Sequence, residues 1–467
     1  MLREGVIFDT DSYKAGHFLQ YPPGTQKIVG YLEARVGADY PYTVFAGLQY
    51  ICKEYLTGSV VTEADVLEAN DFFSRHGEPF PFHGWMKIVD RHGGKLPLRI
   101  RAVKEGAVVP INNVLMTVES LDDELFWLPG WFETQLMRLF HPITVATRSF
   151  ASKKIIKSYL DETADDTNAE INFKLHDFGS RGVSSAESAG IGGMAHLFNF
   201  MGSDTVKGVR FANHYYGCAS KMAGYSIPAM EHSTVTTWGR DFERAAFENM
   251  IVQNKGHNLV ACVSDSYDFY GAVQNIWCDP TMIEFVQKHG KCVVIRPDSG
   301  EPTEVNTNAL RIAEGKIGLV SNTKGYKVLP PYYRLLQGDG NDSEKDIEAV
   351  LHALKEKKYS ASNIAFGMGG GLLQKFNRDT QRFAFKASEI TINNRKHDVY
   401  KCPNGDLTKA SKRGYLDLVK LDNVYYTVKV AESMPHPSSE LVTVLENGKL
   451  MVDYNLDEIR ERINTAL

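Results

Sequence analysis

The sequence has few cysteines, no long hydrophobic run and no excess of basic residues. Its six cysteines are scattered among 467 residues, with no CxxC pair and no histidine at zinc-finger spacing, so cysteine catalysis and cysteine-bound metals are not expected. No segment approaches the length of a membrane span, and the N-terminal residues lack a signal-peptide core. A cytoplasmic enzyme is therefore expected. The formal net charge of −5 disfavours a nucleic-acid-binding surface.

The common nucleotide-binding motifs are also missing. The glycine-rich segment 367–371 matches neither the Walker A pattern nor GxGxxG, so it specifies no particular cofactor. No internal repeat or low-complexity tract occurs. With 43% apolar and 23% charged residues, the composition is that of a globular protein large enough for two domains.

What the sequence does contain is a series of five short apolar runs, each ending abruptly in polar residues or glycine. They lie within residues 171–182, 259–268, 292–300, 333–340 and 364–375. The last four are roughly 30–40 residues apart, which is the length of a βα unit. Because the carboxyl ends of parallel strands meet at one face, we expect one large site for a charged, phosphate-bearing ligand. A β/α barrel and a doubly wound sheet both fit the pattern.

The segments around this series predict a second, β-rich domain. Residues 96–120 are rich in β-branched residues broken by Gly and Pro, which indicates short antiparallel strands. Beyond about residue 385 the chain is again β-like, and residues 415–423 and 424–432 alternate in polarity. We expect this tail to return to the strands of residues 96–120. The predicted division is residues 1–150 with 385–467 as a β-rich α+β domain, and residues 151–384 as a barrel-like catalytic domain.

Helices are predicted from periodicity and caps. Residues 62–75 begin with Thr62 as N-cap and Asp65 as its capping-box partner. Residues 131–160 form a long helical region with an expected interruption near Pro142. Residues 343–358 are amphipathic, with apolar residues at helical spacing. A further helix is expected in LLQKFNRD, directly after the glycine-rich segment.

The polar strand ends offer several kinds of chemistry. Arg296 provides a planar fork for phosphate, and Asp298 could hold ribose hydroxyls or hydrated Mg²⁺, although a loop salt bridge is the better explanation for the pair taken alone. The glycine-rich strand ends suit a bound anion, because glycine lets the backbone approach it closely. Asp268 could be only a helix cap. His232 could be a general base, a phosphoryl acceptor or a hydrogen-bonded structural residue.

Nine longer segments go beyond these generic patterns. They are, in order, TDSYK (10–14), QYPPGT (20–25), HDFGSRGVSS (176–185), GSDT (202–205), EHST (231–234), VSDSYD (263–268), IRPDSG (295–300), LPPYYRLLQGDG (329–340) and IAFGMGGGLLQK (364–375). Together they resemble the nicotinamide phosphoribosyltransferase family of type II phosphoribosyltransferases, over about residues 6 to 460. The resemblance implies an incomplete β/α barrel joined to a second, β-rich domain formed from both ends of the chain.

The resemblance also implies a reaction. Nicotinamide and phosphoribosyl pyrophosphate would give nicotinamide mononucleotide and pyrophosphate in NAD salvage, with Mg²⁺ held mainly through the pyrophosphate. ATP hydrolysis would be coupled through a phosphohistidine at His232. Family members are homodimers with shared active sites, so nicotinamide, phosphoribosyl pyrophosphate, ATP and a second copy of the chain are the expected partners.

Individual roles follow from the matching positions. Phe178 and Tyr13 would hold the nicotinamide ring with Arg181 beside it, and Asp204 would face its carboxamide. Arg296 and Asp298 would hold the ribose and phosphate, and the 5′-phosphate would lie against Gly338, Asp339, Gly369 and Gly370. The second subunit would supply Tyr13, Arg35, Arg378 and Lys386. Asp11 and Ser264 are further candidate substrate-binding residues, and Asp268 is a further candidate catalytic residue.

Three alternatives stay open at this point. A nicotinate-specific relative is disfavoured by Asp204, whose carboxylate would repel that of nicotinate. A phosphate-sugar aldolase or isomerase would need a catalytic lysine or an acid–base pair at the strand ends, and neither stands out. A non-enzymatic protein would leave the polar strand ends unexplained. The chain also departs from vertebrate members, because Ser180 replaces a tyrosine and Ala384 replaces a serine.

Overall fold

The computed structural model describes residues 5–402, 410–431 and 436–467, which form two compact units. Unit 1 comprises Met1–Thr147, His214–Cys218 and Phe376–Ala466. Unit 2 comprises Arg148–Asn213, Ala219–Lys375 and Leu467. Unit 1 is therefore assembled from both ends of the chain, with unit 2 formed largely by the sequence between them.

Unit 2 is organised around a six-stranded parallel sheet. Its strands are β6 (Leu175–Asp177), β7 (Gly202–Ser203), β8 (Leu259–Val263), β9 (Cys292–Arg296), β12 (Tyr333–Gln337) and β13 (Ile364–Met368). Their order in the sheet is β7-β6-β13-β12-β9-β8, and every neighbouring pair is parallel. The five strands predicted from the apolar runs are confirmed. Strand β7 was not predicted.

The two edge strands of this sheet are joined by residues 225–230. Tyr225 forms a parallel bridge with Gly202, and Ala229 forms one with Ala261 of β8. The N–H of Met230 also donates to the carbonyl of Ala261 at 2.9 Å. The sheet therefore curls into a barrel whose last side is closed by an irregular segment, which confirms the predicted incomplete β/α barrel.

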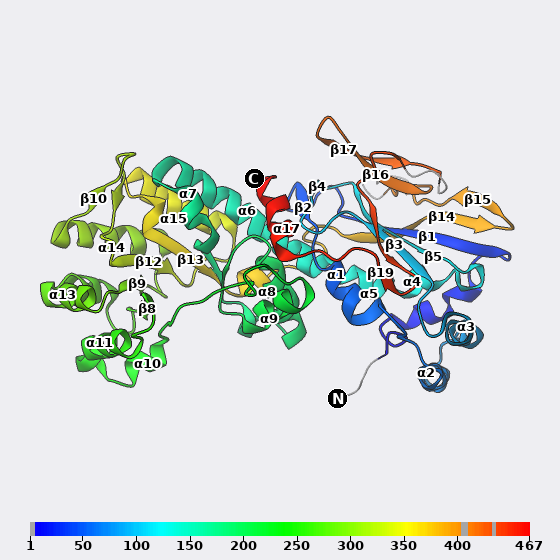
Figure 1. Cartoon of the computed structure of the whole chain (residues 1–467), viewed down its shortest axis with the longest axis horizontal. Helices are drawn as coiled ribbons and strands as arrows, with labels where there is room; N and C mark the ends of the chain where they lie inside the picture. Colours follow the sequence, from blue (N-terminus) through cyan, green and yellow to red (C-terminus); the bar gives the residue numbers. More distant parts are fainter. Residues whose placement is uncertain (1–4, 403–409, 432–435) are drawn as a thin grey trace. The chain divides into compact units, whose positions relative to one another are not determined.

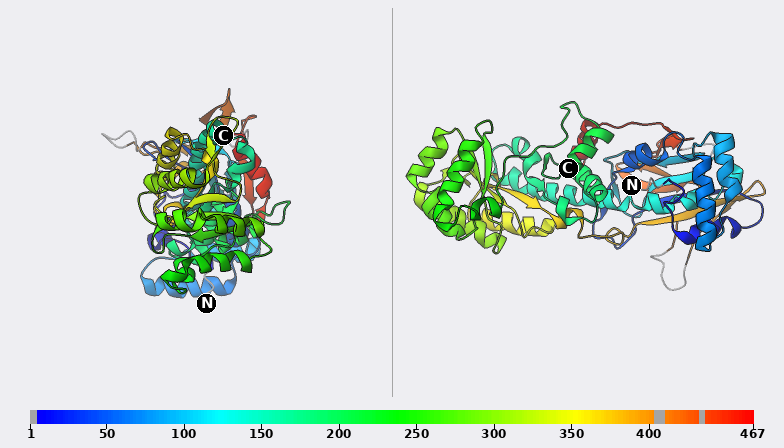
Figure 2. Two further views of the ribbon diagram at one scale, coloured as in Figure 1. Left: turned by 90° about the vertical axis from the view of Figure 1, so that its left-hand side faces the viewer. Right: turned by 90° about the horizontal axis from the view of Figure 1, so that it is seen from below.

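Helices cover the outside of the curled sheet. Figures 1 and 2 show α11, α13, α14 and α15 flanking strands β8, β9, β12 and β13. The longer helices of this unit are α8 (Ala186–His196), α9 (Val206–Tyr215), α11 (Glu243–Gln253), α13 (Pro280–Lys288), α14 (Pro302–Ile317) and α15 (Glu344–Glu356). Helix α15 confirms the amphipathic prediction, because the apolar residues Ile347, Val350, Leu351 and Leu354 are all buried.

Unit 2 also contains shorter elements between these. They are α7 (Thr167–Glu170), η4 (Ile171–Phe173), η5 (Ser180–Gly182), α10 (His232–Thr236), η6 (Arg240–Phe242), α12 (Phe269–Ala272), η7 (Val273–Trp277), β10 (Val320–Ser321), β11 (Lys327–Val328), η8 (Ala361–Asn363) and α16 (Gly370–Leu373). Several of them directly follow strands and thus carry the loops at the strand ends.

Unit 1 contains a seven-stranded antiparallel sheet. Its strands are β1 (Thr25–Glu33), β3 (Leu98–Ala102), β5 (Val114–Ser120), β14 (Ala384–Ile392), β15 (Arg395–Asp398), β18 (Val442–Glu446) and β19 (Lys449–Leu450), in the order β15-β14-β1-β5-β3-β18-β19. Strand β14 pairs with β1, and β18 pairs with β3. The prediction that the C-terminal tail returns to residues 96–120 is therefore confirmed.

Smaller strand pairs and helices complete unit 1. The pairs are β2 (Tyr42–Val44) with β4 (Val108–Pro110), and β16 (Leu416–Leu421) with β17 (Val424–Lys429). The helices are η1 (Ser12–Leu19), α1 (Leu48–Ile51), η2 (Cys52–Leu56), α2 (Glu63–His76), α3 (Phe82–His92), η3 (Asp123–Leu125), α4 (Leu128–Trp131), α5 (Glu133–Met137) and α17 (Leu456–Asn464). Thr62 and Asp65 form the predicted capping box of α2.

The expected interruption near Pro142 is confirmed, whereas one other helix prediction was wrong. The helical region after Trp131 is interrupted before Pro142, which lies in the first turn of α6 (Phe140–Thr163), where proline is tolerated because its missing N–H has no helical acceptor. The helix expected in LLQKFNRD ends at Leu373. Asn377 and Thr380 instead hydrogen-bond nearby backbone N–H groups, which favours a turn over a helix.

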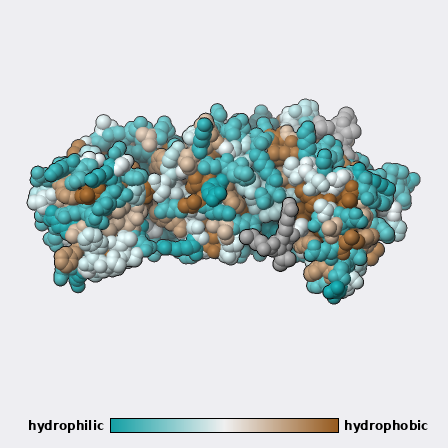
Figure 3. Space-filling model, turned by 60° about the horizontal axis from the view of Figure 1, so that its bottom comes forward, coloured by the Kyte–Doolittle hydropathy of each residue, from teal (hydrophilic) through white to brown (hydrophobic). Residues whose placement is uncertain are grey.

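No broad apolar band crosses the face shown in Figure 3. On the face shown in Figure 3, hydrophobic residues form separate patches among hydrophilic ones. Of the helices in the described part of the chain, none combines the length and the apolar character that crossing a bilayer requires. Isolated apolar patches of this kind are ordinary for a folded protein surface.

Candidate active site at the strand ends of unit 2

A cleft of about 880 Å³ lies where the strands of unit 2 end. It is lined by Phe178, Ser180, Arg181, Gly182, Asp204, Ala229, Met230, Glu231, Arg296, Asp298, Gly338, Asp339, Gly369 and Gly370. These residues end or follow strands β6, β7, β9, β12 and β13, or lie in or directly after the closing segment. Nine candidate site residues from across the sequence are therefore brought to one cavity, as the convergence of parallel strands predicts.

One part of the cleft is built around Phe178. Its N–H donates to the carbonyl of Met368 at 3.0 Å, which ties the loop after β6 to the end of β13. A Cβ on Gly367 would lie 2.3 Å from a ring carbon of Phe178, so only glycine leaves room for the ring in this position. Asp204 also lines the cleft, and the hydroxyl of Ser226 donates to its Oδ1.

Another part of the cleft carries Arg296 and Asp298. Arg296 is the last residue of β9, and its Nε lies 3.7 Å from Oδ1 of Asp298. Within the described part of the chain, this buried Nε has no hydrogen-bond partner. A Cβ on Gly338 would lie 2.5 Å from Oδ1 of Asp298. Glycine at this position thus lets the Arg296–Asp298 pair approach the backbone that follows β12, leaving guanidinium donors available to a ligand.

His232 lies next to this pair. It begins α10, and its Nδ1 is 3.0 Å from the hydroxyl oxygen of Ser266. Its Nε2 lies 3.5 Å from Oδ2 of Asp298 and 3.8 Å from Oδ1 of Asp265. The side chain is 45% exposed, so Nε2 remains accessible while two carboxylates lie close to it. This arrangement suits a histidine whose orientation is controlled by its neighbours.

The remaining strand-end candidates have structural partners. Ser264 is fully buried, where its hydroxyl accepts from the indole N–H of Trp277 at 3.0 Å and donates to the carbonyl of Cys262. Asp268 caps α12 by accepting from the N–H of Gly271 at 3.0 Å. Neither residue lines the cleft.

Asp265 and Asp177 are two carboxylates that were not among the candidate site residues. Asp265 Oδ2 accepts from the N–H of Asp298 at 2.9 Å and from the hydroxyl of Ser299 at 2.6 Å. Asp177 is fully buried directly before Phe178, and its Oδ1 accepts from the N–H of Gly179 at 2.7 Å. Each had only its position at a strand end as a signal in the sequence, since its partners become visible only in the fold.

A second cavity of about 460 Å³ runs inside the barrel and shares Phe178, Asp204 and Ala229 with the cleft. Its walls come from every strand except β7 and include the small side chains of Ala261 and Ala365. Barrels of this type are usually filled by large branched residues, so the alanines leave this interior hollow.

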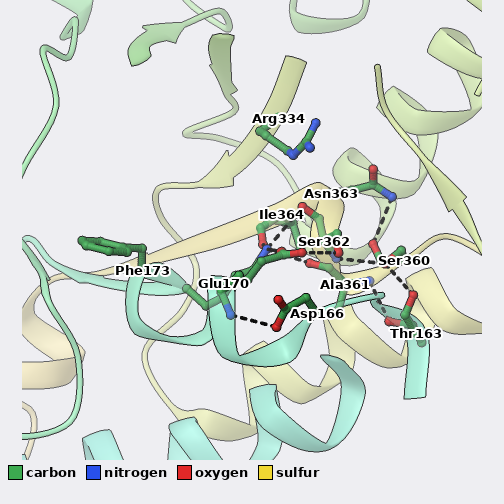
Figure 4. A network of polar contacts seen from close by, with 12 residues as sticks. Thr163, Asp166, Glu170, Phe173, Arg334, Ser360, Ala361, Ser362, Asn363 and Ile364 are labelled. Atoms are coloured by element: carbon green, nitrogen blue, oxygen red, sulfur yellow. Dashed lines mark hydrogen bonds and ion pairs between the residues drawn. The ribbon is translucent and has the colours of Figure 1, made fainter. Parts of the chain in front are cut away.

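A polar network surrounds the far end of this cavity (Figure 4). The ammonium group of Lys174 donates to the carbonyls of Ala361, Ser362 and Ile364 and pairs with Glu170 at 2.8 Å. Burial lowers the pKa of Lys174, with Glu170 opposing that shift. These contacts join the segment before β6 to the segment before β13 and so stabilise the amino ends of the strands.

Five predicted site residues lie in unit 1. Tyr13 is 58% exposed, and Asp11 accepts from the hydroxyl of Thr134 at 2.5 Å. Arg35 donates from Nε to the carbonyl of Arg382 at 3.0 Å, and the exposed Arg378 lies 3.5 Å from Asp379.

Lys386 is the fifth and has the most unusual surroundings. Its Nζ is buried without a hydrogen-bond partner among the described residues. Burial lowers the pKa of Lys386; Glu33 opposes this shift, and the nearby cations Arg35, Lys401 and Lys412 add to it. Arg35, Lys401 and Lys412 thus surround Lys386 with further positive charge, and Glu33 is the carboxylate that opposes it. This excess of positive charge makes the region suited to anions.

No metal cluster is found in the residues that the structure describes, since none of their His, Cys, Asp and Glu side chains form a group of three or more able to hold an ion. Asp298 and Asp339 are the carboxylates in the cleft beside the candidate phosphate-binding groups. Two carboxylates suit a hydrated Mg²⁺ ion that takes its other ligands from a phosphate-bearing substrate.

Comparisons with known proteins agree on a family. The model of the nicotinate phosphoribosyltransferase (NAPRTase) family matches residues 173–434, and the nicotinamide phosphoribosyltransferase N-terminal domain matches residues 5–100. The chain is similar to nicotinamide phosphoribosyltransferase of Xanthomonas campestris, with 46% identity over 99% of both chains.

Two solved structures share the fold. Nicotinate-nucleotide pyrophosphorylase from Pyrococcus furiosus gives a TM-score of 0.64 at 14% identity, covering 98% of this chain and 95% of that one. Human nicotinic acid phosphoribosyltransferase gives a TM-score of 0.59 at 16% identity, covering 98% and 93%. At these identities the likeness supports the architecture alone.

Proposed function

Because the chain belongs to the nicotinamide phosphoribosyltransferases of the NAPRTase family, we propose that it makes nicotinamide mononucleotide for NAD biosynthesis. Phosphoribosyl pyrophosphate donates the phosphoribosyl group to nicotinamide, and pyrophosphate is the second product. The observation that supports this best is the cleft itself, which combines an aromatic ring, carboxylates, arginines and glycine turns in one cavity.

The proposed reaction is a substitution at C1 of the ribose. The pyridine nitrogen forms a bond to C1 while the bond from C1 to the pyrophosphate oxygen breaks, with its electron pair leaving on pyrophosphate. Phe178 holds the ring flat, in line with stacking energies of about 1–3 kcal/mol per base. Arg296 and the backbone at Gly338, Gly369 and Gly370 fix the phosphoribosyl group, so that positioning and charge stabilisation supply the catalysis.

The charges in the cleft call for additional cations. Its lining includes two arginines, Arg181 and Arg296, against four carboxylates, Asp204, Glu231, Asp298 and Asp339. A substrate with several phosphate charges would be repelled by this balance. Mg²⁺, entering with the pyrophosphate and held beside Asp298 and Asp339, would neutralise part of the charge when bound.

A second subunit is the other source of cations in this proposal. Lys386 and its neighbour Arg35 form part of an under-neutralised basic cluster in unit 1. We propose that Arg35, Arg378, Lys386 and Tyr13 serve the cleft of a partner in a homodimer, as oligomers with self-complementary symmetry allow. Asp11 would support the segment that carries Tyr13.

ATP is proposed as a coupled co-substrate through His232. Its Nε2 would attack the γ-phosphorus of ATP, and the bond from that phosphorus to the ADP oxygen would break. A hydrogen bond from Nδ1–H to Ser266 leaves the lone pair on Nε2, the nitrogen closer to the cleft residue Asp298. The phosphohistidine would then organise the pyrophosphate site until water hydrolyses it.

Nicotinate is the alternative pyridine substrate. Asp204 disfavours it, because the carboxylate of nicotinate would meet a second carboxylate in the cleft. The carboxamide of nicotinamide instead offers N–H donors to Asp204.

The direct test is incubation of the purified protein with labelled nicotinamide, phosphoribosyl pyrophosphate and Mg²⁺. We expect labelled nicotinamide mononucleotide and pyrophosphate in equal amounts, and a rate at least ten times lower with labelled nicotinate. A faster reaction with nicotinate would favour the alternative. If neither mononucleotide forms over a range of pH and Mg²⁺ concentrations, the proposed function is wrong.

Sharing of the active site is tested by mixing two inactive variants. Arg296→Ala and Lys386→Ala should each lose most activity, whereas coexpression at equal levels should restore about a quarter of the wild-type activity. Half of randomly formed dimers are mixed, and each mixed dimer regains one of its two sites. The control pairs Arg296→Ala with Asp298→Ala, both in the same cleft, and should restore nothing. No recovery in the first mixture would show that Lys386 does not act across subunits.

A further inference from the structure

The buried carboxylate of Asp177 lies directly beneath the pyridine end of the cleft. It is the last residue of β6, is fully buried, and precedes Phe178 in the chain. Its Oδ1 accepts from the N–H of Gly179 at 2.7 Å. The side chain therefore turns back under the loop that starts with the cleft residue Phe178, although Asp177 itself does not line the cleft.

The backbone of Asp177 reaches the other pyridine-facing residue. Its carbonyl accepts from the N–H of Asp204 at 2.9 Å. Asp177 is thus attached through one group to Gly179, next to the proposed stacking ring, and through another to the proposed specificity carboxylate. Phe178 and Asp204 belong to different strand ends, and Asp177 is hydrogen-bonded to Asp204 and to Gly179, the residue after Phe178.

The loop that Asp177 supports has little freedom to move. A Cβ on Gly179 would lie 2.5 Å from the side chain of Leu373 and 2.8 Å from the carbonyl of Gly369. The loop is therefore packed against the glycine turn that follows β13. If Gly179 lost the acceptor of its buried N–H, the loop could regain a hydrogen bond only by shifting, which would move Phe178.

The carboxylate form of Asp177 is maintained at neutral pH. The pKa of Asp177 is raised to about 6, mainly by burial and also by Asp204, while the N–H of Gly179 and the nearby hydroxyls of Thr205 and Ser203 oppose the shift. At about pH 7.5 most molecules therefore carry a charged acceptor for Gly179. Hydrogen bonds to charged groups are about twice as strong as neutral ones.

We propose that Asp177 is a positioning residue that fixes Phe178 and Asp204 in the geometry that binds nicotinamide. This inference rests on the proposed function, because it concerns the pyridine end of the same cleft. It assigns Asp177 no contact with the substrate and no part in bond making. Its effect should therefore fall on the binding of nicotinamide and leave phosphoribosyl pyrophosphate binding nearly unchanged.

The test compares Asp177→Ala with Asp177→Asn by steady-state kinetics for both substrates. Asp177→Ala should raise the nicotinamide KM about tenfold and change the phosphoribosyl pyrophosphate KM less than twofold. Asp177→Asn keeps an oxygen for Gly179 and should stay within about threefold of the wild-type nicotinamide KM. The matched control is Asp279→Ala, which removes the N-cap of α13 outside the cleft and should leave both KM values unchanged.

Each outcome decides the matter. An unchanged nicotinamide KM in Asp177→Ala, or equal changes in both KM values, would overturn the positioning role. If Asp177→Ala does not fold, Thr205→Val removes a hydroxyl facing Asp177 and should raise the nicotinamide KM about threefold; no rise would overturn the role. A wild-type protein without mononucleotide synthesis would refute the proposed function, whereas an active wild type with an unaffected Asp177→Ala would refute the inference about Asp177 alone.

Discussion

Asp204→Asn is expected to lower the preference for nicotinamide over nicotinate, measured as the ratio of kcat/KM values, by roughly 10–100-fold. Asp204 lines both the cleft and the interior cavity, and Ser226 donates to its Oδ1, which leaves Oδ2 for the carboxamide of the substrate. Two unit charges about 5 Å apart at an effective dielectric constant near 20 repel by about 3 kcal/mol. Partial exposure of Asp204 reduces this, so roughly 1–3 kcal/mol is the expected penalty against nicotinate.

The change should come from both substrates. The kcat/KM for nicotinate should rise, because asparagine removes the repulsion and offers an amide donor to the carboxylate of nicotinate. The kcat/KM for nicotinamide should fall by up to about tenfold, because its hydrogen bond to a charged carboxylate becomes one to a neutral amide. The measurement is kcat/KM for each pyridine at saturating phosphoribosyl pyrophosphate.

A second carboxylate in the same cleft provides the control for Asp204. Glu231→Gln also removes a negative charge from the cleft, but this residue follows the closing segment and adjoins His232. The rate of Glu231→Gln is allowed to fall. The ratio of kcat/KM for nicotinamide to kcat/KM for nicotinate should nevertheless remain within about twofold of the wild-type ratio. An unchanged ratio in Asp204→Asn would refute the specificity role of Asp204.

The sequence was sufficient for most of the barrel because its strands are regular. Strands such as β8 and β9 are continuous apolar runs, as expected for strands buried on both faces, and they were predicted correctly. Strand β7 has two residues, and the closing segment 225–230 contains Pro228 and pairs only through isolated bridges. Neither has a periodicity that could be recognised, because tertiary contacts rather than local preferences determine these elements.

The residues of the candidate site also fall into those that the sequence predicted and those that only the fold reveals. Arg296 and Asp298 stood out because they follow a predicted strand, and the structure places them 3.7 Å apart in the cleft. Asp265 supports them from 33 residues away, and the bond from Asp204 to Asp177 joins two strand ends. Such contacts depend on the order of strands in the sheet, which local patterns do not specify. Residues in these supporting positions therefore appear only once the fold is known.

His232→Ala is expected to abolish the stimulation of mononucleotide synthesis by ATP and to keep the basal rate within about threefold of the wild type. The histidine has Nδ1 3.0 Å from Ser266 and Nε2 3.5 Å from Asp298, so it is held at the cleft without being needed for the substitution at C1. ATP labelled at the γ-phosphate should label the wild-type protein and leave His232→Ala unlabelled. The matched control is His257→Ala, which removes an exposed histidine before β8 and should keep both the label and the stimulation.

Ser266 separates a phosphoryl acceptor from a merely structural histidine. If Nδ1–H donates to Ser266 and Nε2 accepts the phosphoryl group, Ser266→Ala should slow labelling several-fold, because it removes the contact that favours this tautomer. The basal rate should again be nearly unchanged, since neither side chain takes part in breaking the bond to pyrophosphate. Full ATP stimulation in His232→Ala would refute the phosphohistidine outright. Labelling that persists in this variant would place the phosphoryl group on another residue, and the carboxylates closest to Nε2, Asp298 and Asp265, would then be the first to test.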